Sequence, residues 1–248
     1  MGIGEVRSST TPRRLGLPAV TVSRAAQAVW RYVRLAPATF AWLAVLTLTT
    51  YLISRVNPEF RDRFLRQRST NLHELSTHPI RVLISSALWI DGGGLWTYYL
   101  LYNAFHVPVE RMLGTWRWFA VVVAAHVGAT YLSEGVVYWE VRHHYLPFSS
   151  IFTLDVGVSY ALAGSEAVLA YLIAAPWSYL YATLLVVYYG YHLVVGNTFT
   201  DLGHFSALMI GFAFFPLTRV CERRWDPWAT WCSVRHRVAA RAARRPGV

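Results

Sequence analysis

Two side chains of complementary chemistry stand near the starts of two apolar segments of the chain. Ser159 carries a hydroxyl that attacks carbonyl carbon atoms once a base removes its proton, and His204 carries an imidazole that can be this base. If both segments are helices, each side chain lies about 3–5 Å below the helix start, since an α-helix rises about 1.5 Å per residue. The spacing predicts a Ser–His pair, provided that the two helices start at the same level and pack together.

Other ionisable side chains in the apolar segments are His106, His126, Glu134, Glu166 and His192. Such groups are costly in lipid and are functional candidates by default, although a buried His more often bonds a nearby carbonyl. Glu166 follows Ser159 by seven residues, so it lies on nearly the same helix face, about 10 Å deeper. We expect Glu166 either to line a polar cavity below Ser159 or to be a neutral structural carboxyl. Its candidate partners are His192, Tyr188, Tyr189 and Tyr191.

Signals for other chemistries are weak. The chain has no HExxH motif, and the adjacent His143 and His144 present a single metal site poorly, so we expect no metal and no cofactor. The two cysteines form neither a CxxC motif nor a disulfide framework. Asp155 and Asp201 suggest an aspartyl pair, but each stands close to the start of an apolar segment, where Asp caps a helix. Capping is the interpretation that we favour.

The composition indicates the class of protein to which these residues belong. Of the 248 residues, 55% are apolar and 15% are charged, whereas a soluble domain has roughly 45–50% and about 25%. Both differences indicate a membrane protein, and the apolar content excludes a disordered chain. The formal net charge is +10 and all 23 basic residues are Arg. This bias fits a GC-rich genome better than nucleic-acid binding, so we expect no nucleic-acid partner.

Six apolar stretches are long enough to cross a bilayer, which takes roughly 20 helical residues. They cover residues 37–54, 95–109, 118–138, 156–174, 177–196 and 202–218. We therefore predict an all-α, six-helix membrane domain over residues 37–218. The second stretch is the weakest, because Asp91 and the glycines 92–94 interrupt a longer apolar run that starts at Ile80. The segment 80–90 is expected to lie beside it as a short outer element.

The arginines predict the orientation, because basic residues favour cytoplasmic loops. Six precede the first stretch and eight follow the last, so both termini are expected in the cytoplasm of a bacterial cell, with the domain in its plasma membrane. The loop 55–81 also carries six Arg and would lie outside, against the rule. No cleavable signal peptide is visible, so the first stretch is expected to stay as an anchor.

The segments that flank the membrane domain are basic. Residues 1–36 are expected to include an interfacial helix at about 23–37, where Trp30 stands among arginines and valines; a plain basic tail is the alternative. Residues 219–248 form an Arg-rich cytoplasmic tail that we expect to contact anionic lipid headgroups. The lipid bilayer is thus the first partner that the sequence predicts.

Small residues allow the helices of Ser159 and His204 to approach each other closely. Two stripes follow helical spacing: Ser159, Ala163, Ala167, Ala170 and Ala174 on one segment, and Gly203, Ala207 and Gly211 on the other. His204 borders the second stripe. The two stripes can bring the hydroxyl to the imidazole, but they also pack helices without any chemistry.

Four blocks of residues carry a resemblance to a known family. Residues 78–83 read HPIRVL, residues 109–114 read VERMLG, residues 157–159 read GVS with Gly164 later, and Gly203-His204 is followed by Gly211. In this order they resemble the HPxRLL, V-E-[RK]-x-L-G, GxSG and AHxxGxxxG motifs of rhomboid intramembrane serine proteases, over about residues 78–218. The resemblance implies a six-span fold with Ser159 as nucleophile and His204 as base, open to the outer side.

The chain departs from the family pattern beside both of these residues. Tyr160 replaces the glycine that follows the serine, and a tyrosine crowds the approach of a substrate. Ala207 replaces the glycine three residues after the histidine, which is a milder change. The pattern looks like that of a divergent bacterial rhomboid-like branch.

The second stretch lacks the family's His and Asn, which help to hold the oxyanion. Their positions fall at Gly94 and Tyr98. We expect the backbone at Gly157 and Ser159 to remain as a donor, with support from Thr97 or Tyr98. Losing one oxyanion donor costs about 10²–10³ in kcat in a soluble serine protease, so low or absent activity is expected.

Three functions are consistent with these residues. The first is an intramembrane serine protease that cuts single-span membrane proteins near the outer face with Ser159 and His204. The second is a rhomboid-like pseudoprotease that binds transmembrane clients without cutting them. The third is a small transporter or membrane scaffold, although the internal repeats of many transporters are not visible. The substrate and the oligomeric state do not follow from the sequence.

Overall fold

The computed structural model describes residues 19–91, 94–222 and 224–243. Parts of both basic ends (residues 1–18, 223 and 244–248) and two glycines of the predicted break (92 and 93) lie outside the described residues. In the part that is described, every regular element is helical, which confirms the all-α prediction; one isolated parallel bridge joins Ile173 and Trp225. Contacts divide the chain into two units, Met1–Arg34 and Leu35–Val248.

The described residues of the first unit form one helix, α1 (Ala19–Val33), within the predicted basic segment. Its described residues 24–32 are exposed, among them Val29 and Trp30. An exposed helix with apolar and basic residues suits a membrane interface, and this location stays a prediction.

Each of the six predicted apolar stretches is helical in the second unit. They correspond to α2 (Pro37–Ile53), to α6 (Leu95–Leu101) with the π-helix η1 (Tyr102–His106) and α7 (Val107–Leu113), to α8 (Thr115–Arg142), to α9 (Val158–Leu172), to α10 (Trp177–Val195), and to α11 (Phe199–Ala213) with α12 (Phe215–Thr218). The other helices are α3 (Pro58–Arg66), α4 (Leu72–Thr77), α5 (Pro79–Ser86), the 3-10 helix η2 (Phe148–Phe152) and α13 (Pro227–Ala243).

Two of the described helices, α8 and α10, are long and apolar enough to cross a membrane alone. A third candidate appears when α2 is counted together with residues 24–33. The apolar helix α9 has 15 residues, fewer than the roughly 20 that a span takes. The predicted number of six spans therefore goes beyond what helix length alone supports.

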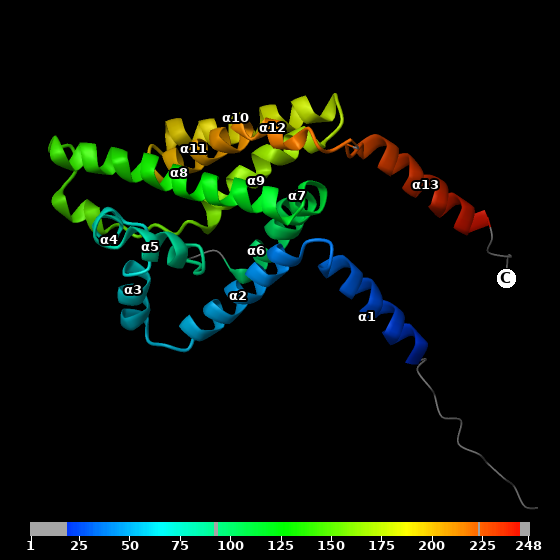
Figure 1. Ribbon diagram of the computed structural model, residues 1–248, viewed down its shortest axis with the longest axis horizontal. Coiled ribbons are helices and arrows are strands. Elements are labelled where there is room, and N and C mark those ends of the chain that lie inside the picture. Colours follow the sequence, from blue (N-terminus) through cyan, green and yellow to red (C-terminus); the bar gives the residue numbers. More distant parts are fainter. Residues whose placement is uncertain (1–18, 92–93, 223, 244–248) are drawn as a thin grey trace, which may run out of the picture. The chain divides into compact units, whose positions relative to one another are not determined.

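Helix α9 is the central helix of the second unit. It packs against α7, α8, α10 and α11, which surround it in the ribbon diagram (Figure 1). Thirteen of its 15 residues are buried, and the two others are Ser159 and Tyr171. A helix that is apolar all round has to be covered by protein or lipid on every side. Here protein covers it, except at the position of Ser159 near one end and of Tyr171 near the other.

The small stripes form the contact between α9 and α11. A Cβ atom at Gly211 would collide with the Gly164 carbonyl oxygen, so the two backbones touch there. The contacts advance in the same direction on both helices, from Tyr160 against Gly203 to a hydrogen bond from the Tyr171 hydroxyl to the Phe212 carbonyl. The helices are therefore parallel, with Tyr160 and Gly203 at about the same level, as the Ser–His prediction requires.

Glu110, the glutamate of the VERMLG motif at residues 109–114, has a structural role. It is 1% exposed, and its carboxylate accepts hydrogen bonds from the backbone N–H groups of Ala38 (3.0 Å) and Thr39 (2.7 Å) and from the Thr115 hydroxyl (2.8 Å). The first N–H groups of a helix have no partner within it, and no other side chain caps α2. The carboxylate thus joins the start of α2 to the turn between α7 and α8.

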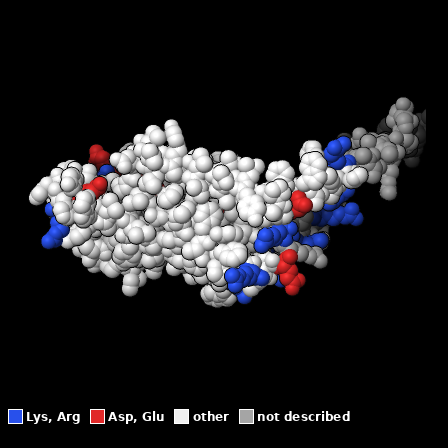
Figure 2. Space-filling model, turned by 90° about the horizontal axis from the view of Figure 1, so that it is seen from above, with Lys and Arg blue, Asp and Glu red and all other residues white. Residues whose placement is uncertain are grey.

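The charged side chains are unevenly distributed over the surface. Figure 2 shows a broad area without any Arg, Asp or Glu, with the charged side chains gathered on either side of it. The sequence agrees, because α10 carries no charged residue and α9 and α11 carry one each. Large apolar side chains of α10 are exposed as well, among them Leu184, Val187 and Val194. Soluble proteins rarely expose so much apolar surface, so the surface of α10 fits contact with lipid.

Candidate functional site

Ser159 is the second residue of α9 and is partly exposed. Its hydroxyl makes no hydrogen bond with any residue that the structure describes. No side chain caps α9, since its N-cap residue is Gly157. The N–H groups of the first turn are therefore free to bind an anionic oxygen. A serine with a free hydroxyl thus stands at the only opening near this end of the described part of the central helix.

His204 lies on α11 between two tyrosine rings and is also partly exposed. The ring centroids of Tyr160 and His204 are 5.1 Å apart in a T-shaped arrangement, and those of Tyr189 and His204 are 6.0 Å apart. The Thr200 carbonyl, one turn earlier, also acts on the imidazole. Tyr160 follows Ser159 directly, so the imidazole lies at the level of the serine. The structure brings both predicted residues to the same end of the bundle, without a hydrogen bond between them among the described residues.

Glu166 extends this region along α9. Its carboxylate accepts a hydrogen bond from the Tyr189 hydroxyl at 2.7 Å, and Tyr181 donates to its backbone carbonyl at 3.2 Å. Of the four candidate partners, Tyr189 is the one that binds; His192 is exposed. Because Glu166 lies on nearly the same helix face as Ser159 but about 10 Å deeper, Tyr189 of α10 covers that face below the serine.

Gly157 allows a histidine to pack against the start of α9. A Cβ atom there would collide with the ring of His126, which is 6% exposed. His126 Nε2 lies 2.9 Å from the Leu83 carbonyl, and since a carbonyl only accepts, Nε2 carries the proton. Nδ1 is left without a partner among the described residues. His126 thus ties α5 to the segment that precedes Ser159.

The two residues predicted to support the oxyanion differ in their surroundings. Tyr98 packs in an apolar cluster that contains Val158, the residue before Ser159. Thr97 is exposed on α6. Tyr98 therefore packs against the cluster that includes the start of α9, whereas Thr97 is not part of it.

Asp155 does not cap α9, so this prediction is wrong. It is 3% exposed, and its carboxylate accepts hydrogen bonds from the hydroxyls of Tyr160 and Thr70, both at 3.1 Å. Burial raises the pKa of Asp155 to about 6, against the effect of these two hydrogen bonds. The capping prediction is confirmed for Asp201, which forms a capping box with Thr198 at the start of α11. The partner Thr70 is 85 residues away in the chain, and no local pattern reveals it.

A second Ser–His pair was not anticipated. The Ser165 hydroxyl lies 3.0 Å from His106 Nδ1, which also accepts a hydrogen bond from Trp118 Nε1 at 3.0 Å. Both Ser165 and His106 are fully buried, and the rings of Trp42 and Tyr102 pack against the imidazole. No substrate can reach this pair, so its hydrogen bond stabilises the contact of η1 with α8 and α9.

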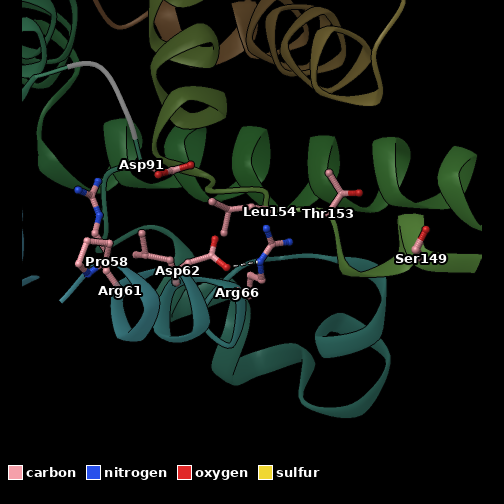
Figure 3. A pocket seen from close by; sticks show the side chains of 9 residues that line it. Pro58, Arg61, Asp62, Arg66, Asp91, Ser149, Thr153 and Leu154 are labelled. Atoms are coloured by element: carbon pink, nitrogen blue, oxygen red, sulfur yellow. Dashed lines mark hydrogen bonds and ion pairs between the residues drawn. The ribbon is translucent and has the colours of Figure 1, made fainter. Parts of the chain in front are cut away.

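A polar pocket lies beside the segment that leads into α9. It has a volume of about 530 Å³ and is lined by α3, by Asp91 and by residues of the 149–154 segment (Figure 3). The ion pair of Asp62 with Arg66 (2.9 Å) crosses its floor and lowers the pKa of Asp62. The pocket offers charges of both signs next to Thr153 and Leu154, close in sequence to Ser159.

Comparison with known proteins identifies a family. The model of a family described as "Rhomboid-like protein" matches residues 31–224, which include α2 to α12 and every residue of the site. Searches of curated proteins and of solved structures find nothing that matches the chain.

Proposed function

Because the chain belongs to the rhomboid-like family, we propose that it is an intramembrane serine protease that uses a dyad of Ser159 and His204. The observation that carries this proposal is the exposure of Ser159. Among the described residues, Ser159 is the one opening near its end of the otherwise buried helix α9, level with the partly exposed His204. Single-span membrane proteins would be cut near the outer face. A serine that served only to pack the helix against its neighbours would be buried.

The proposal includes six spans with both termini in the cytoplasm of a bacterial cell. The family membership, the apolar helices and the uncharged surface support a membrane protein. The short helix α9 is compatible with six spans because protein surrounds it, and non-helical backbone at membrane depth is tolerated where it is buried in protein. Ser159 would then lie within reach of the outer aqueous layer.

The proposed reaction is ordinary serine acyl transfer. His204 takes the proton of the Ser159 hydroxyl as the oxygen bonds to the carbonyl carbon of the scissile peptide. The free N–H groups at the start of α9 hold the oxyanion, with Tyr98, which packs against the cluster of Val158, as the candidate for a side-chain donor. The imidazolium gives its proton to the leaving amine when the C–N bond breaks. Water, deprotonated by His204, then releases the acyl group and restores the hydroxyl.

A fluorophosphonate probe tests this proposal, because it phosphonylates only an activated serine. The full-length protein in detergent is expected to be labelled, and both Ser159→Ala and His204→Ala are expected to abolish labelling. Ser165→Ala is the matched control on the same helix, since Ser165 is fully buried and should leave the label in place. No labelling of the folded protein would overturn the proposal, as would labelling that persists in Ser159→Ala.

One observation favours a second function, a rhomboid-like pseudoprotease that binds transmembrane clients. Ser159 and His204 share no hydrogen bond in the described structure, and neither residue at the family's second-span positions is His or Asn. An unlabelled but folded protein that co-purifies with single-span membrane proteins would support this alternative.

A further inference from the structure

Helix α3 has an aromatic side and a charged side. Phe60 and Phe64 lie one turn apart with stacked rings, 5.9 Å between their centroids, and Trp89 packs against Phe64. Phe60 is half exposed. Only residues 54–57 separate α3 from α2, which is a proposed span. Exposed aromatic and basic side chains on a helix beside a span are typical of a helix in the interface between lipid and water.

The charged side of α3 faces the polar pocket. Arg61, Asp62 and Arg66 line the pocket from α3, and Asp91 lines it from another segment of the chain (Figure 3). The Arg66 guanidinium already has partners, because it donates to Asp62 at 2.9 Å and to the Phe152 carbonyl at 3.1 Å. Arg66 and Asp62 therefore belong to the wall of the pocket and satisfy each other.

The two other charges of the pocket are not paired. Among the residues that the structure describes, neither Arg61 nor Asp91 forms an ion pair or a side-chain hydrogen bond. Figure 3 shows the ion pair of Asp62 with Arg66, whereas Arg61 and Asp91 stand without a partner among the side chains drawn. The charge of Asp91 acts on Arg66, but no hydrogen bond joins them. A guanidinium and a carboxylate that face one pocket unpaired fit a ligand with both a negative and a positive group.

At a membrane surface, the headgroup of a zwitterionic phospholipid is such a ligand. A guanidinium binds a phosphate through charge-assisted hydrogen bonds, often two at once. A primary ammonium donates up to three hydrogen bonds, whereas the methylated ammonium of a choline headgroup has no N–H to donate. An unpaired carboxylate therefore selects ethanolamine over choline. The pocket volume of about 530 Å³ lies within the range of small-molecule sites, about 300–1,000 Å³.

We propose that this pocket binds the headgroup of an ethanolamine phospholipid, with Arg61 on the phosphate, Asp91 on the ammonium and the acyl chains beside Phe60. A bound headgroup connects α3 to the 149–154 segment, which leads into α9. It also gives an arginine of the loop 55–81 a partner on the proposed outer side, where the charge rule does not expect basic residues. The inference does not depend on the dyad, because neither dyad residue lines the pocket.

Native mass spectrometry of the full chain measures the bound lipid. The protein is reconstituted in vesicles with equal amounts of phosphatidylethanolamine, phosphatidylcholine and phosphatidylglycerol, and is extracted in a mild detergent. We expect the wild type to retain phosphatidylethanolamine about fivefold over phosphatidylcholine, the effect of one charge pair at a partly exposed site. Asp91→Asn should remove this preference. Arg61→Gln should lower the retention of all three lipids by about fivefold, because all three carry the phosphate.

Two neighbours on α3 are the matched controls. Arg63→Gln and Glu59→Gln remove exposed charges of the same two kinds outside the pocket, and both variants should retain lipid like the wild type. Equal retention of phosphatidylethanolamine and phosphatidylcholine by the wild type would overturn the inference. Equal retention of lipid by Arg61→Gln and Arg63→Gln would do the same. A wild type that prefers phosphatidylglycerol would show a simple anion site and would contradict the function given to Asp91.

The soluble headgroup distinguishes a lipid from a free zwitterion. Glycerophosphoethanolamine contains the same phosphate and ammonium but no acyl chains. Added at the concentration of the lipid, it is expected to leave the bound phosphatidylethanolamine in place. Displacement of the lipid would show that the pocket takes a soluble ligand, and the assignment to a phospholipid would be wrong.

Discussion

At the residue scale, the start of α9 depends on an unusually close approach of side chain to backbone. The ring of His126 lies against Gly157 where any other residue would place its Cβ atom. The ring cannot retreat easily, because its Nε2 is bonded to the Leu83 carbonyl on α5. The φ of Gly157 is −79°, so space rather than backbone conformation requires the glycine.

Gly157→Ala is therefore expected to destabilise the protein by about 1–3 kcal/mol, the usual cost of an overpacked core. Thermal unfolding in detergent micelles measures the change. Gly135→Ala on α8 is the control, since no atom lies within 4 Å of a Cβ there and the substitution favours a helix. Equal melting temperatures for Gly157→Ala and the wild type would show that the ring moves aside freely.

The sequence predicts the level of Ser159 and His204 but not their surroundings. The structure places Tyr160 against Gly203, so the two residues lie at about the same level, although α11 begins at Phe199, three residues before the predicted start. Which way Tyr160 points depends on the rotation of α9 among four neighbours. The partner of Asp155 comes from a loop 85 residues earlier. Neither has a local signal, whereas Glu166 and Tyr189 were recognisable as isolated polar groups on apolar helices.

At the scale of elements, one carboxylate joins three segments. Glu110 satisfies two N–H groups at the start of α2 and the hydroxyl of Thr115 at the start of α8. The sequence showed this glutamate as part of a motif, but its role could not be read from it, because α2 precedes it by some 70 residues. The six apolar stretches, in contrast, were recognisable because an apolar run determines a helix locally.

Glu110→Ala should destabilise the protein by roughly 2 kcal/mol or more, since buried donors without a partner cost about 1–3 kcal/mol each. Urea or thermal unfolding in micelles gives the value. Glu59→Ala on α3 removes an exposed glutamate and is expected to change stability by less than about 0.5 kcal/mol. If both variants unfold alike, the carboxylate does not hold the start of α2.

At the scale of the whole molecule, the membrane topology depends on the crossing of α9. Three helices that we propose as spans, α9, α10 and α11, separate η2 from α13. An odd number of crossings puts these two elements on opposite sides. With α9 only 15 residues long, the alternative is that it enters and leaves on one side, which would put both elements on the same side.

Cysteine labelling in intact bacterial cells distinguishes the two arrangements. In a variant with Cys221 and Cys232 replaced by Ala, a single cysteine is placed at Ser149 on η2 or at Val234 on α13, both exposed. Six spans predict that a membrane-impermeant maleimide labels Ser149→Cys in intact cells and Val234→Cys only after permeabilisation. Equal labelling of both in intact cells, or of neither, would place η2 and α13 on one side. Ser159 would then lie in a helix that does not span the bilayer, and the proposed outer opening of the site would be wrong.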